Sequence, residues 1–384
     1  MHKKIKCVLP LLQIINKIYY NSIEMKSLKI GDLTSLIPIV QGGMGVGISL
    51  SGLASAVAKE GGIGVISAAG LGLLYRKLSP NYTEAGNLGL IEEVRKTREK
   101  IRETGGIIGV NIMVALSDFA ELVKTCISEK VDIIFSGAGL PLDLPSFLKK
   151  DSVTKLVPIV SSARATRIIC ERWQAHYNYL PDAVVLEGPK AGGHLGFKET
   201  QLNDERFSLE ELLPEVVQEV SLFEQKYHKN IPVIAAGGIY TGEDILRIMN
   251  LGASGVQLGT RFVTTTECDA SEAFKNAYIQ ATQEDIEIIK SPVGMPGRAI
   301  RSSFLDKVKE GLKQPKICPY NCIKTCNIAT SPYCIIMALY NAFIGNFEYG
   351  YAFAGSNAFR AKRITSVKET FQELINEWKN GENQ

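Results

Sequence analysis

Short apolar runs rich in Val and Ile alternate along the chain with longer segments whose apolar residues recur at helical spacing. The runs are predicted as strands and the longer segments as amphipathic helices. The predicted strands cover residues 37–40, 64–67, 107–111, 133–136, 157–160, 183–186, 233–235 and 256–258, and the predicted helices cover 52–60, 91–103, 119–129, 164–176, 209–226 and 242–251. The linker LPLDLPSFLKK between the fourth and fifth strands has room for only a short helix.

Strands and helices that alternate over roughly 230 residues indicate an α/β fold and favour a (β/α)8 TIM barrel. An open doubly wound sheet remains the alternative, because periodicity alone does not show closure. After Phe262 the alternation stops, and the pattern becomes mostly helical with breaks at SPVGMPGR and QPKICPYNC. We therefore expect an N-terminal extension (1–27), the barrel (28–264), a smaller, mainly helical substrate or cap domain (265–354) and a C-terminal helix that returns to the barrel (355–384).

The charge balance excludes some partners. The chain has 43 Lys and Arg against 40 Asp and Glu, a net charge of +3, which is not the basic footprint of a nucleic-acid-binding protein. No apolar run reaches the ~18 residues that a membrane-spanning helix needs. The first residues superficially resemble a signal peptide but lack a small-residue cleavage site. We expect a cytoplasmic protein whose compact part opens at Met25 and which binds neither nucleic acid nor membrane.

Glycines gather in the loops that follow the predicted strands, where barrel enzymes place their active sites. In many barrels the loops after the seventh and eighth strands bind phosphate through backbone N–H groups. Gly237, Gly238, Gly259 and Thr260 are placed for that task. The alternative is that these glycines only make tight turns.

One of only four histidines, His194, follows two adjacent glycines in the loop EGPKAGGHLGF after the sixth predicted strand. Glycines let a backbone approach a ligand closely, and an imidazole beside them can transfer a proton near neutral pH. A solvated loop histidine without a chemical role is the alternative. We favour a catalytic role for His194.

Five motifs occur in a fixed order: QGGMG, GVN at 109–111, AGGH at 191–194, AAGGI at 235–239 and LGTRF at 258–262. Together they resemble the nitronate monooxygenase family, formerly called 2-nitropropane dioxygenases, which also includes FMN-dependent enoyl-acyl-carrier-protein reductases. The resemblance covers about residues 28–305, and SPVGMPGRAIRSSF is similar to the family's linker out of its second domain. It implies FMN as the cofactor and a barrel with a smaller substrate domain.

The resemblance also implies which residues contact FMN. Those along the ring are Gly42, Gly43, Met44 and Asn111, those from the sixth loop are Glu187, Gly192 and Gly193, and those near the phosphate are Gly237, Gly238, Gln257, Leu258, Gly259 and Thr260. Asn111 suits its position because an amide offers both a donor and an acceptor. The alternatives are an Asn111 that satisfies a strand end in the core and a Gln257 that faces solvent.

By the same resemblance, His194 would take the α-proton of a neutral nitroalkane as a general base, or hold the charge of a nitronate through a hydrogen bond. The expected reaction is oxidation of an alkyl nitronate by O2. The alternative on the same scaffold is an NAD(P)H-dependent reductase of an enoyl thioester or a quinone. Where the family often has Q-G-x-E-A-G-G-H, this chain has Glu187 and Lys190, and both changes can retune the flavin or the substrate preference.

Two further interpretations lie outside flavin chemistry. A phosphate-binding barrel of the inosine-monophosphate-dehydrogenase type would need a nucleophilic cysteine on an active-site loop, and no cysteine lies near residues 187–197. A non-catalytic metabolite-binding barrel would leave His194 without a function. The sequence leaves the oligomeric state open, with a homodimer as one option.

Four of the eight cysteines, Cys318, Cys322, Cys326 and Cys334, fall within the segment CPYNCIKTCNIATSPYC. Four thiols so close in sequence can hold an iron–sulfur cluster or zinc, but the spacing is not a common signature. In one continuous helix the first three would spread over ~12 Å, so metal binding requires a broken backbone here. We favour reduced cysteines that pack the second domain, and predict no metal.

Overall fold

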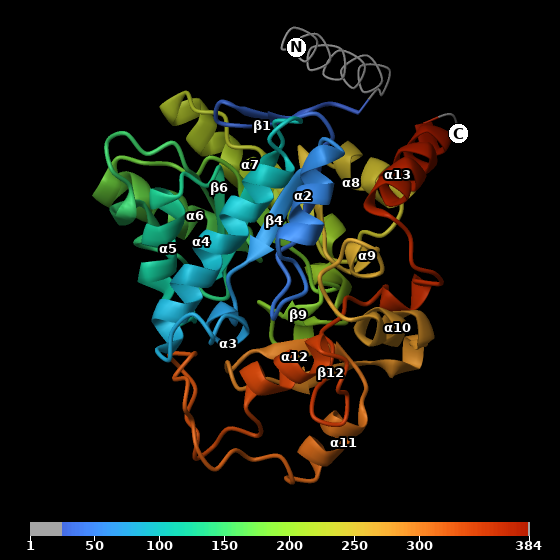
Figure 1. Cartoon of the computed structure of the whole chain (residues 1–384). Helices are drawn as coiled ribbons and strands as arrows, with labels where there is room; N and C mark the ends of the chain where they lie inside the picture. Colours follow the sequence, from blue (N-terminus) through green and yellow to red (C-terminus); the bar gives the residue numbers. More distant parts are fainter. Residues whose placement is uncertain (1–24, 383–384) are drawn as a thin grey trace, which may run out of the picture.

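The computed structural model describes residues 25–382, so residues 1–24 of the predicted extension lie outside the described part. Parallel strands close into a barrel in the order β10, β11, β3, β4, β5, β6, β7 and β8 (Figure 1). These strands are β3 (Ile39–Gln41), β4 (Ile63–Ser67), β5 (Ile107–Met113), β6 (Ile133–Gly137), β7 (Lys155–Val160), β8 (Val184–Glu187), β10 (Val233–Ala236) and β11 (Gly255–Leu258). The predicted (β/α)8 TIM barrel is confirmed, and each predicted strand lies within two residues of its observed bounds.

Apolar side chains fill the barrel interior, because its strands are buried on both faces. Val65 and Phe135 belong to this interior cluster. A hairpin of β1 (Leu28–Ile30) and β2 (Leu33–Ser35) adds Leu28 and Ile30 to the same cluster. Leu28 lies against the backbone at Gly255, where β11 begins. The hairpin therefore closes the amino-terminal end of the barrel and leaves the carboxyl-terminal end to the functional loops.

Amphipathic helices surround the strands: α2 (Ser51–Lys59), α3 (Leu71–Leu74), α4 (Tyr82–Lys100), α5 (Phe119–Ser128), α6 (Ala163–Tyr177), α7 (Leu209–Tyr227), α8 (Gly242–Asn250) and α13 (Val367–Glu382). The helix expected near the C-terminus is α13, which packs against α8 and α2. The backbone N–H of Gly242 donates to Glu377 of α13 at 2.7 Å. Only a 3-10 turn, η1 (Leu144–Phe147), lies between β6 and β7, as the short linker predicts. Among residues 25–382, no helix is both long and apolar enough to cross a membrane.

After β11 the chain forms a layer over the carboxyl-terminal end of the barrel, at the bottom of Figure 1. The short helix α9 (Thr260–Val263) follows β11 directly. The elements of the layer are α10 (Glu272–Gln280), η4 (Gln283–Asp285), β12 (Ile286–Lys290), β13 (Pro296–Ile300), α11 (Ser303–Lys309) and α12 (Ile335–Phe343). The remaining 3-10 turns are η2 (Glu199–Gln201), η3 (Glu205–Phe207) and η5 (Ala358–Arg360). β12 and β13 form an antiparallel hairpin, and β13 also pairs with β9 (Gly193–His194) from the barrel. The mostly helical pattern missed this sheet, because such short strands carry little periodic signal and β9 and β13 are far apart in sequence.

Candidate active site

One large cavity opens at the carboxyl-terminal ends of the barrel strands, where the fold places active sites. It holds about 250 Å³ and is lined by the loops that follow the strands and by residues of the covering layer. The residues predicted to bind FMN or to act in catalysis all line it: Gly42, Gly43, Met44, Asn111, Glu187, Gly192, Gly193, His194, Gly237, Gly238, Gln257, Leu258, Gly259 and Thr260. The five motifs, although far apart in sequence, thus meet at one site.

The loop after β3 packs closely against two amide side chains. The backbone N–H of Gly42 donates to the carbonyl of Leu258 at 2.8 Å, and Gln257 lies beside Gly42. Gly43 has no room for a Cβ, which would overlap the side chain of Asn111 on β5. Asn111 and Gln257 are only partly buried and line the cavity, so both amides can exchange hydrogen bonds with a ring laid along this loop.

Two glycine loops and one lysine form another part of the wall. Gly237 and Gly238 have positive φ angles of 96° and 87°, a backbone conformation that residues with a Cβ atom rarely adopt. The side chain of Lys190 packs against Gly238 and lines the same cavity as Gly259. Lys190 is the only Lys or Arg among the described residues that line this cavity. It was not assigned to the site from the sequence, yet it brings positive charge to the predicted phosphate loops.

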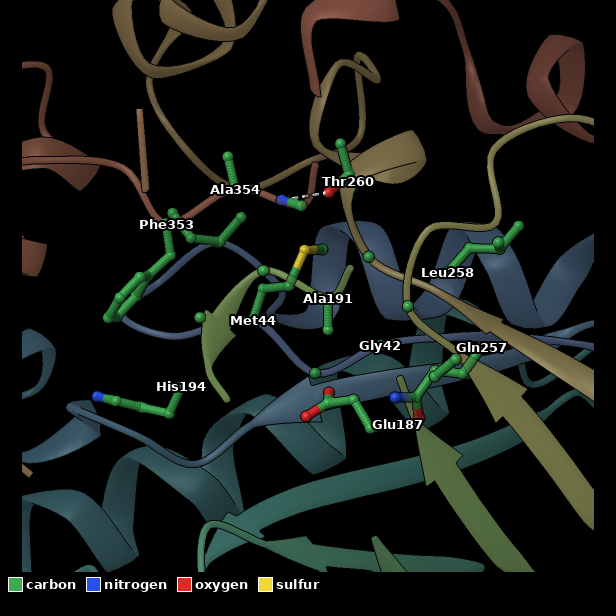
Figure 2. A pocket seen from close by; sticks show the side chains of 18 of the residues that line it. Gly42, Met44, Glu187, Ala191, His194, Gln257, Leu258, Thr260, Phe353 and Ala354 are labelled. Carbon is green, nitrogen blue, oxygen red and sulfur yellow. Dashed lines mark hydrogen bonds between the residues drawn. The ribbon is translucent and has the colours of Figure 1, made fainter. Parts of the chain in front are cut away.

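A segment near the C-terminus completes this wall, and sequence reasoning missed it. Its residues Phe353, Ala354, Gly355 and Asn357 line the cavity. The N–H of Gly355 donates to Oγ1 of Thr260 at 3.0 Å, the bond drawn in Figure 2. Nδ2 of Asn357 donates to the carbonyl of Gly238 at 2.6 Å. No periodic pattern marks this segment, and its Gly-Ser-Asn turn was the one signal available.

Glu187, the last residue of β8, faces the cavity between His194 and Gln257 (Figure 2). Among the described residues its carboxylate has no hydrogen-bond or ion-pair partner. Burial raises the pKa of Glu187 to about 7. Near neutral pH this group therefore passes between a neutral acid, which can donate a hydrogen bond, and a carboxylate, which can only accept.

His194 lines the same cavity from β9. Its Nε2 lies 2.7 Å from Oγ of Ser291, and its ring meets Phe353 edge-on with the ring centroids 5.0 Å apart. Burial lowers the pKa of His194 to about 4, so the imidazole is neutral at physiological pH. Ser291 lies in the turn between β12 and β13 and had not been assigned to the site, although the motif SPVGMPGR contains it.

Arg298 of β13 holds the loop that carries His194. The residue is 7% exposed, and its Nη1 donates to the carbonyls of Pro189 and Ala191, both at 2.6 Å. Burial lowers its pKa to about 10, so the guanidinium remains charged at neutral pH. Its neighbour Gly297 pairs with His194 across the sheet. The covering layer therefore positions the histidine as well as closing the cavity.

The four clustered cysteines lie outside this cavity, in the segment between α11 and α12. Cys322 is buried, Cys326 and Cys334 are partly buried, and Cys318 is exposed. Within the described part of the chain, no three Cys, His, Asp or Glu side chains come together in a group that could hold a metal ion.

Comparison with known proteins identifies the family. The family model for nitronate monooxygenase matches residues 26–377. The chain belongs to the nitronate monooxygenase family. As a member of this family the protein is an oxidoreductase, and the identification from the order of its motifs is confirmed.

Relatives within and near the nitronate monooxygenase family have different names. A probable nitronate monooxygenase of Staphylococcus saprophyticus is 29% identical over 301 residues, which cover 73% of this chain and 80% of the relative. A (3aS,4S,5R,7aS)-5-hydroxy-7a-methyl-1-oxo-octahydro-1H-indene-4-carboxyl-CoA dehydrogenase of Mycobacterium tuberculosis is 29% identical over 284 residues, covering 73% of this chain and 68% of the relative.

Two solved structures have the same architecture. FabK from Thermotoga maritima superposes with a TM-score of 0.69 at 28% identity, covering 90% of this chain and 94% of that one. Nitroalkane oxidase from Streptomyces ansochromogenes gives a TM-score of 0.68 at 22% identity, covering 90% of this chain and 97% of that one, and supports the fold alone.

Proposed function

We propose that the protein is an FMN-dependent nitronate monooxygenase that oxidises alkyl nitronates with O2. The observation that carries the proposal is that glycine loops, two amide side chains and a neutral histidine all line one cavity. Membership of the nitronate monooxygenase family supports it independently.

The residues present fit FMN. A Cβ on Gly259 would meet nothing closer than Met44 Sδ at 3.5 Å, so the backbone there faces open space that a phosphate group can occupy. Lys190 supplies a positive charge near that space, and Gly237 and Gly238 bring backbone close to it. Asn111 would hold the ring, which when bound supplies the electron-accepting chemistry of the reaction. Gln257, which the resemblance assigns to the phosphate, lies beside Gly42, so its amide could contact the ring instead.

His194 is the group that can act on the substrate. Its pKa of about 4 keeps the imidazole neutral, so one ring nitrogen carries a proton and the other has a free lone pair. The contact with Ser291 fixes the ring orientation through Nε2. A neutral imidazole held in this way can accept the α-proton of a nitroalkane or donate a hydrogen bond to the oxygen of a nitronate.

The second candidate is an NAD(P)H-dependent reductase of an enoyl thioester or a quinone. Two similarities favour it: FabK from Thermotoga maritima shares the fold at 28% identity, and the mycobacterial relative is named for a carboxyl-CoA substrate. In this reaction His194 would position the substrate rather than remove a proton.

The absorbance spectrum of the purified protein tests the cofactor, and anaerobic mixing tests the reaction. We expect a yellow protein that releases FMN on denaturation and whose flavin absorbance is bleached by a nitronate without NAD(P)H. A colourless protein that cannot be reconstituted with FMN would refute the cofactor. Bleaching by NAD(P)H but not by nitronate, followed by turnover of an enoyl thioester, would replace the monooxygenase with the reductase.

The variant His194→Asn separates the two roles of the histidine. It should retain FMN, because the loop contacts that we propose for the cofactor come from Glu187 and the glycine backbone. Its rate on neutral nitroalkane should fall by about 10²–10⁴-fold and its rate on preformed nitronate much less, since only the nitroalkane needs a base. Equal losses on the two substrates would assign His194 to anchoring instead of proton transfer.

A further inference from the structure

The carboxylate of Glu187 lies in the active-site cavity without a partner among the described residues. Glu187 ends β8, and its side chain faces the cavity between His194 and Gln257 (Figure 2). Buried polar groups almost always have a hydrogen-bond partner, and a buried carboxyl group without one in a cavity is a candidate for a role toward the ligand. The function proposed above gives this group no chemical role.

The backbone holds Glu187 in this position. Glu187 pairs across the sheet with Ala236 of β10, and the N–H of the next residue, Gly188, donates to the carbonyl of Ala236 at 2.8 Å. A Cβ atom on Gly237 would lie 2.8 Å from the carbonyl oxygen of Gly188, so the two loops are in close contact here. Strand pairing and this contact keep the carboxyl group at the cavity.

Burial is the only cause of the raised pKa of Glu187, which is about 7. The strands on either side of β8 place apolar side chains at the cavity, Ile159 from β7 and Ala236 from β10. The other titratable residues that line the cavity are Lys190, His194, Tyr240 and Tyr278. Burial keeps His194 neutral and raises the pKa of both tyrosines, which leaves Lys190 as the one other charged group among the described residues of the cavity.

Neither Lys190 nor the nearby Arg298 forms an ion pair with Glu187. The side chain of Lys190 packs against Gly238, and Nη1 of Arg298 donates to two carbonyls of the loop that follows β8. No cation therefore holds Glu187 in its charged form. Its protonation depends on its burial and on the charge of the ligand in the cavity.

The ring of the proposed flavin would lie along Gly42, Gly43 and Asn111, which line the same cavity as Glu187. A flavin ring that accepts two electrons and one proton carries one negative charge. Like charges in a buried site repel each other, and a carboxylate in that situation binds a proton. Because the pKa of Glu187 is already about 7, a modest further rise is enough to protonate it at neutral pH.

We propose that Glu187 takes up one proton when a flavin bound in this cavity is reduced to its anionic form, and releases that proton on reoxidation. The ring takes two electrons and one proton, and the carboxylate of Glu187 takes a second proton and becomes the neutral acid. The electrons come from the reducing substrate in turnover and from dithionite in the test, and both protons come from solvent. The proposal rests on the FMN cofactor proposed above but not on the choice of substrate.

The midpoint potential of the flavin, measured anaerobically against dyes of known potential from pH 5.5 to 8.5, tests the proposal. Below about pH 6 Glu187 is already neutral, so the unchanged protein and Glu187→Gln should show the same pH dependence. Above about pH 7 the unchanged protein should take up two protons per two electrons, and Glu187→Gln only one. Relative to the variant, the ratio of reduced to oxidised flavin in the unchanged protein should then fall by up to about tenfold per pH unit, which corresponds to about 30 mV.

Glu199→Gln is the matched control, because it changes an exposed carboxylate on η2 that does not line the cavity. This variant should keep the steeper pH dependence of the unchanged protein. Equal slopes above pH 7 for the unchanged protein and Glu187→Gln, with flavin bound to both, would overturn the proposal and leave the cofactor assignment intact. A protein that binds no flavin would refute both.

Difference infrared spectroscopy of the unchanged protein tests the same step without a variant, should Glu187→Gln lose the flavin. Reduction at pH 8 should convert a carboxylate band into the C=O band of a carboxylic acid, and exchange into D2O should shift the new band. Reduction at pH 5.5 should give no such band, because Glu187 holds its proton before and after. Absence of a new carboxylic-acid band at pH 8 would overturn the proposal.

Discussion

Replacing Glu187 with Gln should change how stability depends on pH. Burial raises the pKa of Glu187 from 4.5 to about 7, so between these values the folded protein holds a proton that the unfolded chain has released. Its contribution to stability is therefore fully present below about pH 4.5 and is lost as the pH rises through 7. A shift of this size corresponds to about 3 kcal/mol, and we expect about 1–3 kcal/mol because the carboxylate faces a cavity that water can enter.

Urea unfolding of the unchanged protein and of Glu187→Gln at pH 5, 6, 7 and 8 measures this difference. The free energy of unfolding of the variant, relative to the unchanged protein, should rise by about 1–3 kcal/mol between pH 5 and pH 8. Glu103→Gln, which changes an exposed carboxylate in the same way, serves as the control and should give parallel curves. Parallel curves for Glu187→Gln as well would refute the reasoning.

The titration of His194 changes the stability of the protein in the opposite direction over much of the same pH range. Burial lowers its pKa from 6.5 to about 4, so its contribution to stability is lost as the pH falls from about 6.5 to 4. In the unchanged protein the two effects partly cancel between pH 4.5 and 6.5. Glu187→Gln should therefore leave a variant whose stability rises with pH across this interval.

Three further substitutions test other parts of the site. Gly259→Val should abolish FMN retention, measured as flavin released per chain, because the new side chain projects beside Met44 into the cavity; full retention would contradict the phosphate assignment. Ser291→Ala removes the contact to Nε2 of His194 and should lower kcat on nitroalkane by about 5-fold to 10-fold, whereas an unchanged rate would show that Ser291 does not orient the ring. Arg298→Met leaves the carbonyls of Pro189 and Ala191 without a hydrogen-bond donor. The free energy of unfolding, measured by urea titration, should fall by about 2–4 kcal/mol. A loss below about 0.5 kcal/mol would contradict the positioning role of Arg298.

The barrel was predictable because its strands are local in sequence and buried on both faces. Runs such as IGVIS at Ile63–Ser67 are mostly apolar, are buried at every position and follow a pair of glycines. The loop residues could be assigned because a barrel brings all carboxyl-terminal strand ends to one side. Gly42 and Thr260 could therefore be placed at one site without knowledge of their distance.

The residues of the site that the sequence did not predict reach it through contacts between positions far apart in the chain. Ser291 reaches His194 only because β13 pairs with the two-residue strand β9. Asn357 reaches Gly238 because the chain returns to the barrel just before α13. Neither contact leaves a repeat or a periodic pattern, so local sequence signals could not reveal them.

The segment at residues 353–357, which completes the cavity wall, is among the last parts of the chain to be synthesised. This segment and α13 are synthesised after the whole barrel, and until they emerge from the ribosome Thr260 and Gly238 lack the partners that Gly355 and Asn357 provide. A growing or truncated chain can therefore complete its barrel strands but not the wall of the binding cavity. Retention of a ligand in this cavity thus distinguishes a finished chain from one that stopped short.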